Sequence, residues 1–295
     1  MCLHDVHFSH PFITFAVLVS IFGVQYLAAI IVESDVNVCI LSPIVVPHVW
    51  KCIYLEGINL YPFLSFIYPM IVVISIGGSV IAPTLDAKKF IAYAEVIKEI
   101  AKSNTVLIVT GGGKAARDYI GVARSMGANE AVCDLIGISL SRLNARLLIS
   151  ALSSVAFQDI PHDYMEAENA MSSHKVVVMG GVTPGQTTDA VSAILAEYVQ
   201  AALLITATSV DGVYTADPHL DKEAKKLDEV TPDELVKIVM SAEMKAGFKS
   251  VVDPLAAKII ERSQIETVIV DGQNPRILLD ALSGKKVGTR IIHKS

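Results

Sequence analysis

Apolar residues from position 70 onward gather in short, continuous runs that are rich in β-branched side chains. Runs of this length and composition predict strands that are buried on both faces. Glycine, proline or polar residues close most of them. The predicted strands cover residues 70–76, 105–109, 176–179, 203–207, 267–270 and 289–292.

Segments with helical spacing of apolar residues separate these runs. In the first of them, Phe90, Ala94 and Ile97 fall on one face, as expected for an amphipathic helix. Strands that alternate with helices predict an α/β fold, here a three-layer α/β/α sandwich around a mainly parallel sheet. The predicted helices cover residues 86–103, 115–126, 130–151, 190–199, 232–239, 254–263 and 275–282.

The first 69 residues differ from the rest in charge. They hold one basic and four acidic residues, whereas residues 70–295 hold the other 23 basic and 26 acidic residues. We therefore expect a hydrophobic N-terminal extension at 1–69 and one domain at 70–295. Residues 11–32 lack charge and are long enough to span a bilayer. No basic residue precedes them, so we favour a start at Met70 over a membrane anchor.

Overall charge and cysteine content exclude several classes of protein. A formal net charge of −6 lacks the basic footprint of a nucleic-acid-binding protein. The chain has four cysteines and no Cys-x-x-Cys motif, which predicts neither a disulfide framework nor a zinc site and fits a reducing cytoplasm. No metal-ligand set is predicted.

Glycine-rich turns follow three of the predicted strands, at residues 77–79, 111–113 and 180–181. Ligands of α/β sheets bind at the carboxyl ends of strands, where glycine lets backbone N–H groups approach an anion. The turns therefore predict binding of several phosphate groups. None forms a Walker A or Gly-x-Gly-x-x-Gly motif, which disfavours a nicotinamide-binding domain.

Three charged residues lie beside these turns. Arg117 and Lys114 follow Gly113 at the start of a predicted helix, where a cation opposes the helix dipole unless it neutralises a bound phosphate. Asp189 follows Thr187 and Thr188 near the start of another helix, as a cap or as a functional carboxylate. These residues are the catalytic candidates.

Several motifs, in order along residues 70–295, resemble the amino acid kinase family and within it the archaeal uridylate kinase branch. Residues 1–69 match nothing in that family. The motifs are Ile76-Gly77-Gly78-Ser79, Gly111-Gly112-Gly113-Lys114, Asp134-Leu135-Ile136-Gly137-Ile138, Thr187-Thr188-Asp189-Ala190, Val210-Asp211-Gly212-Val213-Tyr214 and Asp253-Pro254-Leu255-Ala256-Ala257-Lys258.

The resemblance implies phosphorylation of UMP to UDP by ATP with Mg²⁺, in a cytoplasmic homohexamer that UTP inhibits and that has no membrane or nucleic-acid partner. It implies UMP contacts at Gly112, at Asp134 through the sugar hydroxyls, and at Val182, Thr183, Pro184, Gly185, Gln186, Thr187 and Thr188. It implies ATP contacts at Ser75, Ile76, Gly77, Gly78, Ser79, Gly113, Arg117, Thr208, Ser209, Tyr214 and Asp217.

The sequence departs from the family at two positions. Ser75 stands where many relatives have a lysine that stabilises the transferred phosphoryl group, so Lys114, Lys222 and Lys225 remain as candidates. Ser209 replaces a common asparagine. Two alternatives stay open: a family member that phosphorylates acetylglutamate, carbamate or isopentenyl phosphate, and a membrane-tethered nucleotide sensor without catalysis.

Overall fold

A computed structural model describes residues 13–21, 24–33, 36–43, 69–216, 223–243 and 251–292. The chain divides into two compact units, residues 1–61 and residues 62–295. The first contains an antiparallel sheet of three strands, β1 (Ile13–Ile21), β2 (Val24–Glu33) and β3 (Val36–Pro43), in that order. The described residues of the uncharged run 11–32 therefore form two paired strands, not one helix.

The second unit is built on a seven-stranded sheet with the order β10-β12-β11-β7-β4-β5-β6. Only the β11–β12 pair is antiparallel among its described pairs. The strands are β4 (Ile71–Ile76), β5 (Thr105–Thr110), β6 (Val176–Met179), β7 (Leu203–Thr208), β10 (Glu229–Val230), β11 (Thr267–Asp271) and β12 (Thr289–Ile291). A separate antiparallel pair consists of β8 (Val213–Tyr214) and β9 (Lys226–Leu227).

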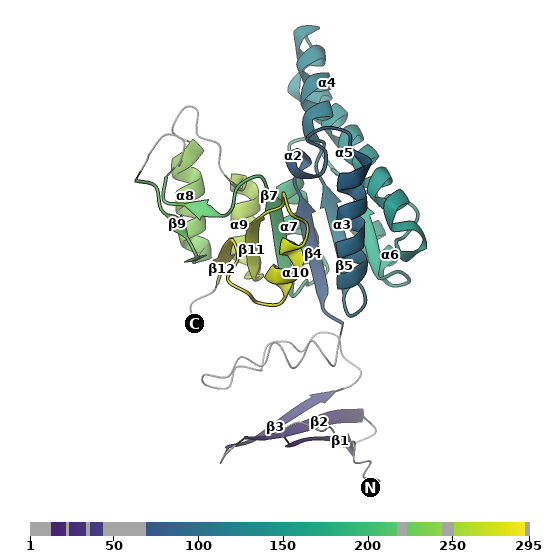
Figure 1. Cartoon of the computed structure of the whole chain (residues 1–295), viewed down its shortest axis with the longest axis vertical. Helices are drawn as coiled ribbons and strands as arrows, with labels where there is room; N and C mark the ends of the chain where they lie inside the picture. The colour runs from purple at the N-terminus through teal and green to yellow at the C-terminus, as the bar shows by residue number, and fades with distance from the viewer. Residues whose placement is uncertain are drawn as a thin grey trace. The chain divides into compact units, whose positions relative to one another are not determined.

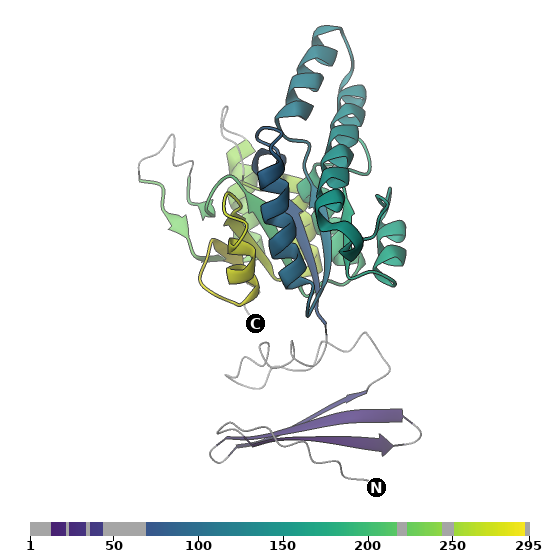
Figure 2. The same cartoon turned by 45° about the vertical axis from the view of Figure 1, so that its right-hand side comes forward.

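Helices cover both faces of this sheet (Figure 1). Helices α4 and α5 form a hairpin that extends past the carboxyl ends of the strands, as Figure 2 also shows. The helices are α2 (Gly78–Ile81), α3 (Ala87–Ile100), α4 (Gly113–Ser125), α5 (Glu130–Leu152), α6 (Tyr164–Met171), α7 (Thr188–Tyr198), α8 (Pro232–Glu243), α9 (Pro254–Ser263) and α10 (Ile277–Leu282).

Alternating side chains of the strands enter two separate cores. In β4, Val72, Ile74 and Ile76 pack with apolar residues of α3, α5 and α10. Val73 points the other way, into a core shared with α7, α8 and α9. Because successive strand residues face opposite sides of a sheet, one apolar run supplies both cores. The predicted three-layer α/β/α sandwich is confirmed.

Most predicted elements match the structure to within a few residues. The elements that were not predicted are β1, β2 and β3, the short helix α2, helix α6 and the two-residue strands β8, β9 and β10. Asp163 caps α6 by accepting a hydrogen bond from the Glu166 backbone N–H. In the described part of the chain one helical stretch, Glu130–Val155, is long and apolar enough to cross a membrane. It contains α5, whose Leu148 and Leu152 lie fully buried in the domain core.

Candidate active site

The glycine turns after β4 and β5 touch each other through their backbones. A Cβ atom on Gly78 would lie 2.1 Å from the Gly113 nitrogen, and one on Gly111 would lie 2.3 Å from the Gly78 nitrogen. The Gly111 N–H donates to the carbonyl of Ile76 at 2.9 Å. Only glycine permits this approach, so the sequence places backbone amides of two strands together.

Gly113 begins α4 in the left-handed region, with φ of +71°. A Cβ atom there would lie 2.5 Å from the carbonyl oxygen of Ala82, which follows α2. The first residues of α4 therefore lie against the turn after β4. A helix N-terminus with its free N–H groups is a suitable place for an anion.

The third glycine turn, after β6, is connected to the second through α5. Ser141 accepts a hydrogen bond from the Gly181 N–H at 2.8 Å, and Asn144 donates to the Gly111 carbonyl at 2.8 Å. Thr110 donates to the Ser141 carbonyl at 2.9 Å. Since β4, β5 and β6 are adjacent parallel strands, all three turns lie at one edge of the sheet. Ser141, Asn144 and Thr110 were not predicted from the sequence. Their only signal in the sequence is that each is a polar residue within a largely apolar segment.

Asp189 lies at the same edge and accepts a hydrogen bond from the fully buried Ser75 hydroxyl at 3.1 Å. Burial and the nearby Asp253 carboxylate raise the pKa of Asp189 to about 6, against the effect of Ser75. Thr187 is the N-cap of α7, since it accepts from the Ala190 N–H at 3.1 Å. Asp189 is therefore a functional candidate and not the cap.

Asp253 was missed as a site residue, although it belongs to one of the matched motifs. It caps α9 by accepting hydrogen bonds from the N–H groups of Leu255 at 2.8 Å and Ala256 at 3.1 Å. Its other oxygen accepts from the Thr187 hydroxyl. The contact links the starts of α7 and α9 and brings a second carboxylate to Asp189.

Loop 182–188 and Asp134 come together as predicted for one ligand site. Asp134, from α5, accepts a hydrogen bond from the Gly185 N–H at 2.8 Å. Gln186 accepts one from the Tyr164 hydroxyl at 3.2 Å. Within the loop Thr183, Pro184, Gly185 and Thr187 are exposed, and Val182, Gln186 and Thr188 are half-buried. Gly112 is the N-cap of α4, and a Cβ atom there would lie 3.4 Å from the Gly137 carbonyl oxygen of α5.

The candidate cations differ in their availability. Lys114 forms an ion pair with Asp118 one turn along α4, whereas Arg117 is exposed and makes no hydrogen bond or ion pair within the described residues. Among the described residues, Lys225 makes contacts only through its backbone, which pairs with Thr215. Lys222 lies outside the described residues. Arg117 is thus the cation of α4 that is free to meet a ligand.

Thr208 and Ser209 lie at the end of β7, beside β4. The carbonyl of Ala207 accepts from the Gly77 N–H at 2.9 Å, so Thr208 and the exposed Ser209 follow directly beside the first glycine turn. Tyr214 donates to Asp211 at 2.9 Å, and this hydrogen bond raises the pKa of Tyr214. Ile76 is buried, and Ser79 is half-buried in α2. Asp217 lies outside the described residues.

A parallel sheet with glycine turns along one carboxyl edge defines a class of phosphate-binding α/β domain, and the comparison with known proteins identifies it. Residues 70–271 match the model of the amino acid kinase family, and the chain belongs to that family. The resemblance seen in the motifs is confirmed.

Among its relatives, the uridylate kinase of Methanosarcina mazei is 57% identical over 216 residues, 73% of this chain and 93% of the relative. The uridylate kinase of Methanococcoides burtonii is 57% identical over 233 residues and matches over its whole length and 76% of this chain. The crystal structure of uridylate kinase from Archaeoglobus fulgidus is 49% identical with a TM-score of 0.69, covering 75% of this chain and 99% of that one.

Proposed function

We propose that this chain transfers the γ-phosphoryl group of ATP to UMP, producing UDP and ADP. The observation that carries the proposal is the backbone contact between Gly78, in the expected ATP turn, and the turn Gly111–Gly113, which contains the expected UMP contact Gly112. Relatives at up to 57% identity that are called uridylate kinases support the choice of nucleotide.

The two nucleotides occupy neighbouring parts of the rim, which is the carboxyl edge of the sheet where the glycine turns lie. On the ATP side, we assign the turn 75–79, Gly113 and Arg117 to the phosphates, and Thr208, Ser209, Tyr214 and Asp217 to the nucleoside. On the UMP side, we assign Gly112 and the loop 182–188 to the phosphate and base. Asp134 accepts hydrogen bonds from the sugar hydroxyls, which suits a carboxylate that already orders Gly185 at 2.8 Å.

An oxygen of the UMP phosphate attacks the γ-phosphorus in line, the bond from that phosphorus to the bridging β–γ oxygen breaks, and ADP leaves. The attacking phosphate is largely ionised near neutral pH, so no general base is needed. Because both reactants are anions, catalysis consists of positioning them and neutralising their charge. Backbone N–H groups of the glycine turns and the Arg117 guanidinium, which is free of protein partners in the described part of the chain, supply that neutralisation.

The residues at the rim fit Mg²⁺ delivered with ATP. The described residues contain no group of three or more His, Cys, Asp or Glu side chains suited to hold a metal by themselves. Mg²⁺ takes one or two carboxylates together with substrate phosphates, and Asp189 with Asp253 offers that donor set. Bound there, the ion would supply positive charge to the phosphates. Asp189 then orients cations and abstracts no proton.

Ser75 cannot replace the lysine found at its position in many relatives. Its hydroxyl is buried and engaged with Asp189, so its influence on ATP passes through that carboxylate. The missing charge comes from Arg117, Lys222 or Lys225, or from Lys114 once it leaves its exposed ion pair with Asp118. The proposal also includes a cytoplasmic homohexamer that UTP inhibits. Exposed apolar side chains on α4 and α5, among them Tyr119, Val122 and Leu143, support assembly.

A coupled assay that detects ADP separates the candidates. The full chain is given ATP and Mg²⁺ with UMP, CMP, acetylglutamate, carbamate or isopentenyl phosphate in turn. We expect turnover with UMP to exceed turnover with every other acceptor. Faster turnover of acetylglutamate, carbamate or isopentenyl phosphate would assign the chain to another branch of the family, and no turnover with any acceptor would favour a nucleotide sensor.

A further inference from the structure

Gly181 joins the turn after β6 to loop 182–188, and both of its backbone polar groups are held by α5. Its N–H donates to the Ser141 hydroxyl at 2.8 Å, and its carbonyl accepts from the Nε–H of Arg142 at 3.0 Å. A residue whose backbone N–H and carbonyl are both hydrogen-bonded has little freedom to rotate. Two consecutive residues of α5 therefore fix the direction in which the loop leaves the sheet.

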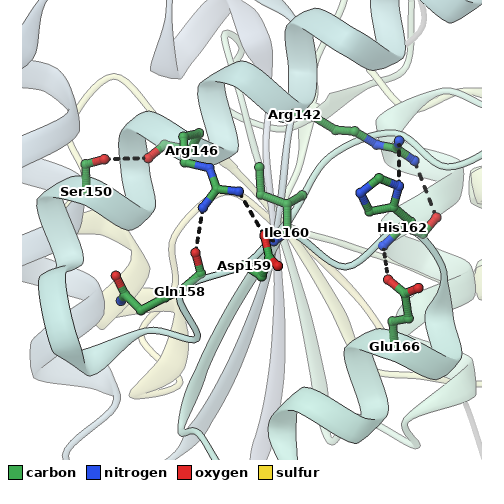
Figure 3. A network of polar contacts seen from close by, with 8 residues as sticks. All are labelled: Arg142, Arg146, Ser150, Gln158, Asp159, Ile160, His162 and Glu166. Carbon is green, nitrogen blue, oxygen red and sulfur yellow. Dashed lines mark hydrogen bonds and ion pairs between the residues drawn. The ribbon is translucent and has the colours of Figure 1, made fainter.

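Arg142 also binds the segment that precedes α6 (Figure 3). Its Nη1 lies 3.2 Å from the ring Nδ1 of His162, and its Nη2 donates to the His162 carbonyl at 3.4 Å. The His162 N–H in turn donates to Glu166 at 2.7 Å. Arg142, half-buried, thus connects α5, the glycine turn and the start of α6 through one guanidinium group.

The same segment supports the loop at a second point. Tyr164, two residues after His162, donates its hydroxyl hydrogen to the Gln186 side chain at 3.2 Å. Burial raises the pKa of Tyr164 to about 12, so the phenol keeps this hydrogen at neutral pH. The loop is therefore held by Arg142 at Gly181, the residue that precedes it, and by Tyr164 at Gln186. Both supports involve the segment between residues 162 and 166.

We propose that Arg142 is a positioning residue for the acceptor nucleotide, which it serves by fixing the loop 182–188 through Gly181. The inference rests on the proposed function, because that loop is the expected UMP site. The planar guanidinium donates in several fixed directions at once, whereas a lysine donates from a single point. Both the contact to Gly181 and the contact to His162 therefore require arginine and not merely a positive charge.

Arg146 is a matched control on the same helix, one turn beyond Arg142 (Figure 3). It also bridges α5 to the segment before α6, through the carbonyl of Gln158 and the carboxylate of Asp159 at 3.0 Å. None of its described contacts reaches a glycine turn or the loop. A substitution of Arg146 removes a similar bridge without removing a contact to the loop 182–188.

The experiment measures initial rates of the full chain against UMP and against ATP for Arg142→Lys, Arg142→Gln and Arg146→Gln. We expect both Arg142 variants to raise the KM for UMP about tenfold, the usual scale for loss of a hydrogen bond from a charged group. The KM for ATP stays within about twofold, because the turn after β4 keeps its contacts. Arg146→Gln leaves both constants at their wild-type values.

Three results would overturn the proposal: a wild-type KM for UMP in Arg142→Lys, equal rises in the KM values for UMP and ATP, or the same effect in Arg146→Gln. Should the Arg142 variants fail to fold, Tyr164→Phe is measured in the same way. We expect it to raise the KM for UMP and to leave the KM for ATP unchanged. Wild-type chain that turns over no UMP would refute the proposed function itself, whereas active wild type with unaffected variants refutes only the role of Arg142.

Discussion

Asp189 is the residue in which fold and chemistry conflict. Its carboxyl group is buried beside Ser75 and near Asp253, and its pKa rises from the usual 3.8 to about 6. Burial disfavours the charged form, and a like charge nearby disfavours it further. The protein keeps a carboxylate here at a cost in stability, which suits a group that becomes neutralised only when cations and phosphates bind.

Asp189→Asn should stabilise the free protein at neutral pH and impair catalysis. The folded state holds this proton more tightly than the unfolded chain, so the stability linked to the group is full at low pH and is lost as the pH rises through about 6. Because asparagine does not ionise, the variant does not lose this stability at high pH. Its free energy of unfolding near pH 7.5 should exceed the wild-type value by about 1–3 kcal/mol.

Urea denaturation at several pH values checks this prediction. The gain should shrink steadily between about pH 6 and pH 4, where the wild-type carboxyl is neutral in the folded state and the unfolded chain approaches its own pKa. The kcat should fall at least about tenfold, since an amide orients cations poorly. A gain that is the same at both ends of the pH range, or a loss at neutral pH, would contradict the assignment.

At the scale of elements, the start of α4 depends on one unusual backbone conformation. Gly113 has a φ of +71°, and a Cβ atom there would meet the Ala82 carbonyl at 2.5 Å. Gly121, inside the same helix, has no other atom within 4 Å of such a Cβ. Alanine should therefore be unfavourable at Gly113 and tolerated at Gly121.

Gly113→Ala should lower the free energy of unfolding by about 1–3 kcal/mol, because alanine rarely adopts this φ and would collide with backbone. It should also raise the KM for ATP, since the turns after β4 and β5 must separate. Gly121→Ala should raise the free energy of unfolding by about 0.5–1 kcal/mol, through the better helix propensity of alanine, with unchanged kinetics. Chemical denaturation and initial rates test the pair, and equal effects of the two variants would refute the role of Gly113.

The sequence predicts those elements whose pattern is local. Continuous apolar runs identify β4, β5, β6, β7, β11 and β12, and the helical spacing of apolar residues identifies the long helices. Helix α6 has eight residues with few large apolar ones, and β8, β9 and β10 have two each, too short for any period. These short elements form because of contacts with segments that are distant in the sequence.

The same limit applies to the site. The glycine turns and the 182–188 loop are contiguous motifs, so they could be found without coordinates. Asp253 acts on Asp189 only because α7 and α9 start side by side, a contact that Thr187 makes directly. Ser141 and Arg142 are inconspicuous in an apolar helix, and their function is visible only when Gly181 lies beside them.

At the scale of the whole molecule, all residues of the two described cores come from position 70 onward. The family match covers residues 70–271, and the domain assignment 1–69 and 70–295 remains a prediction. A protein of residues 70–295 should therefore be active, with a kcat/KM for UMP within about twofold of the full chain. Steady-state kinetics on both proteins, with their oligomeric states from light scattering, tests this. Loss of activity on removal of residues 1–69 would show that the first unit takes part in catalysis.

The central claim is that the rim of glycine turns holds two nucleotides with their phosphates end to end. A dinucleoside polyphosphate that joins uridine to adenosine tests it most directly in inhibition kinetics. We predict competitive inhibition against both UMP and ATP, because one molecule fills both sides of the contact between Gly78 and Gly111. Competition with only one of the two substrates would contradict the claim.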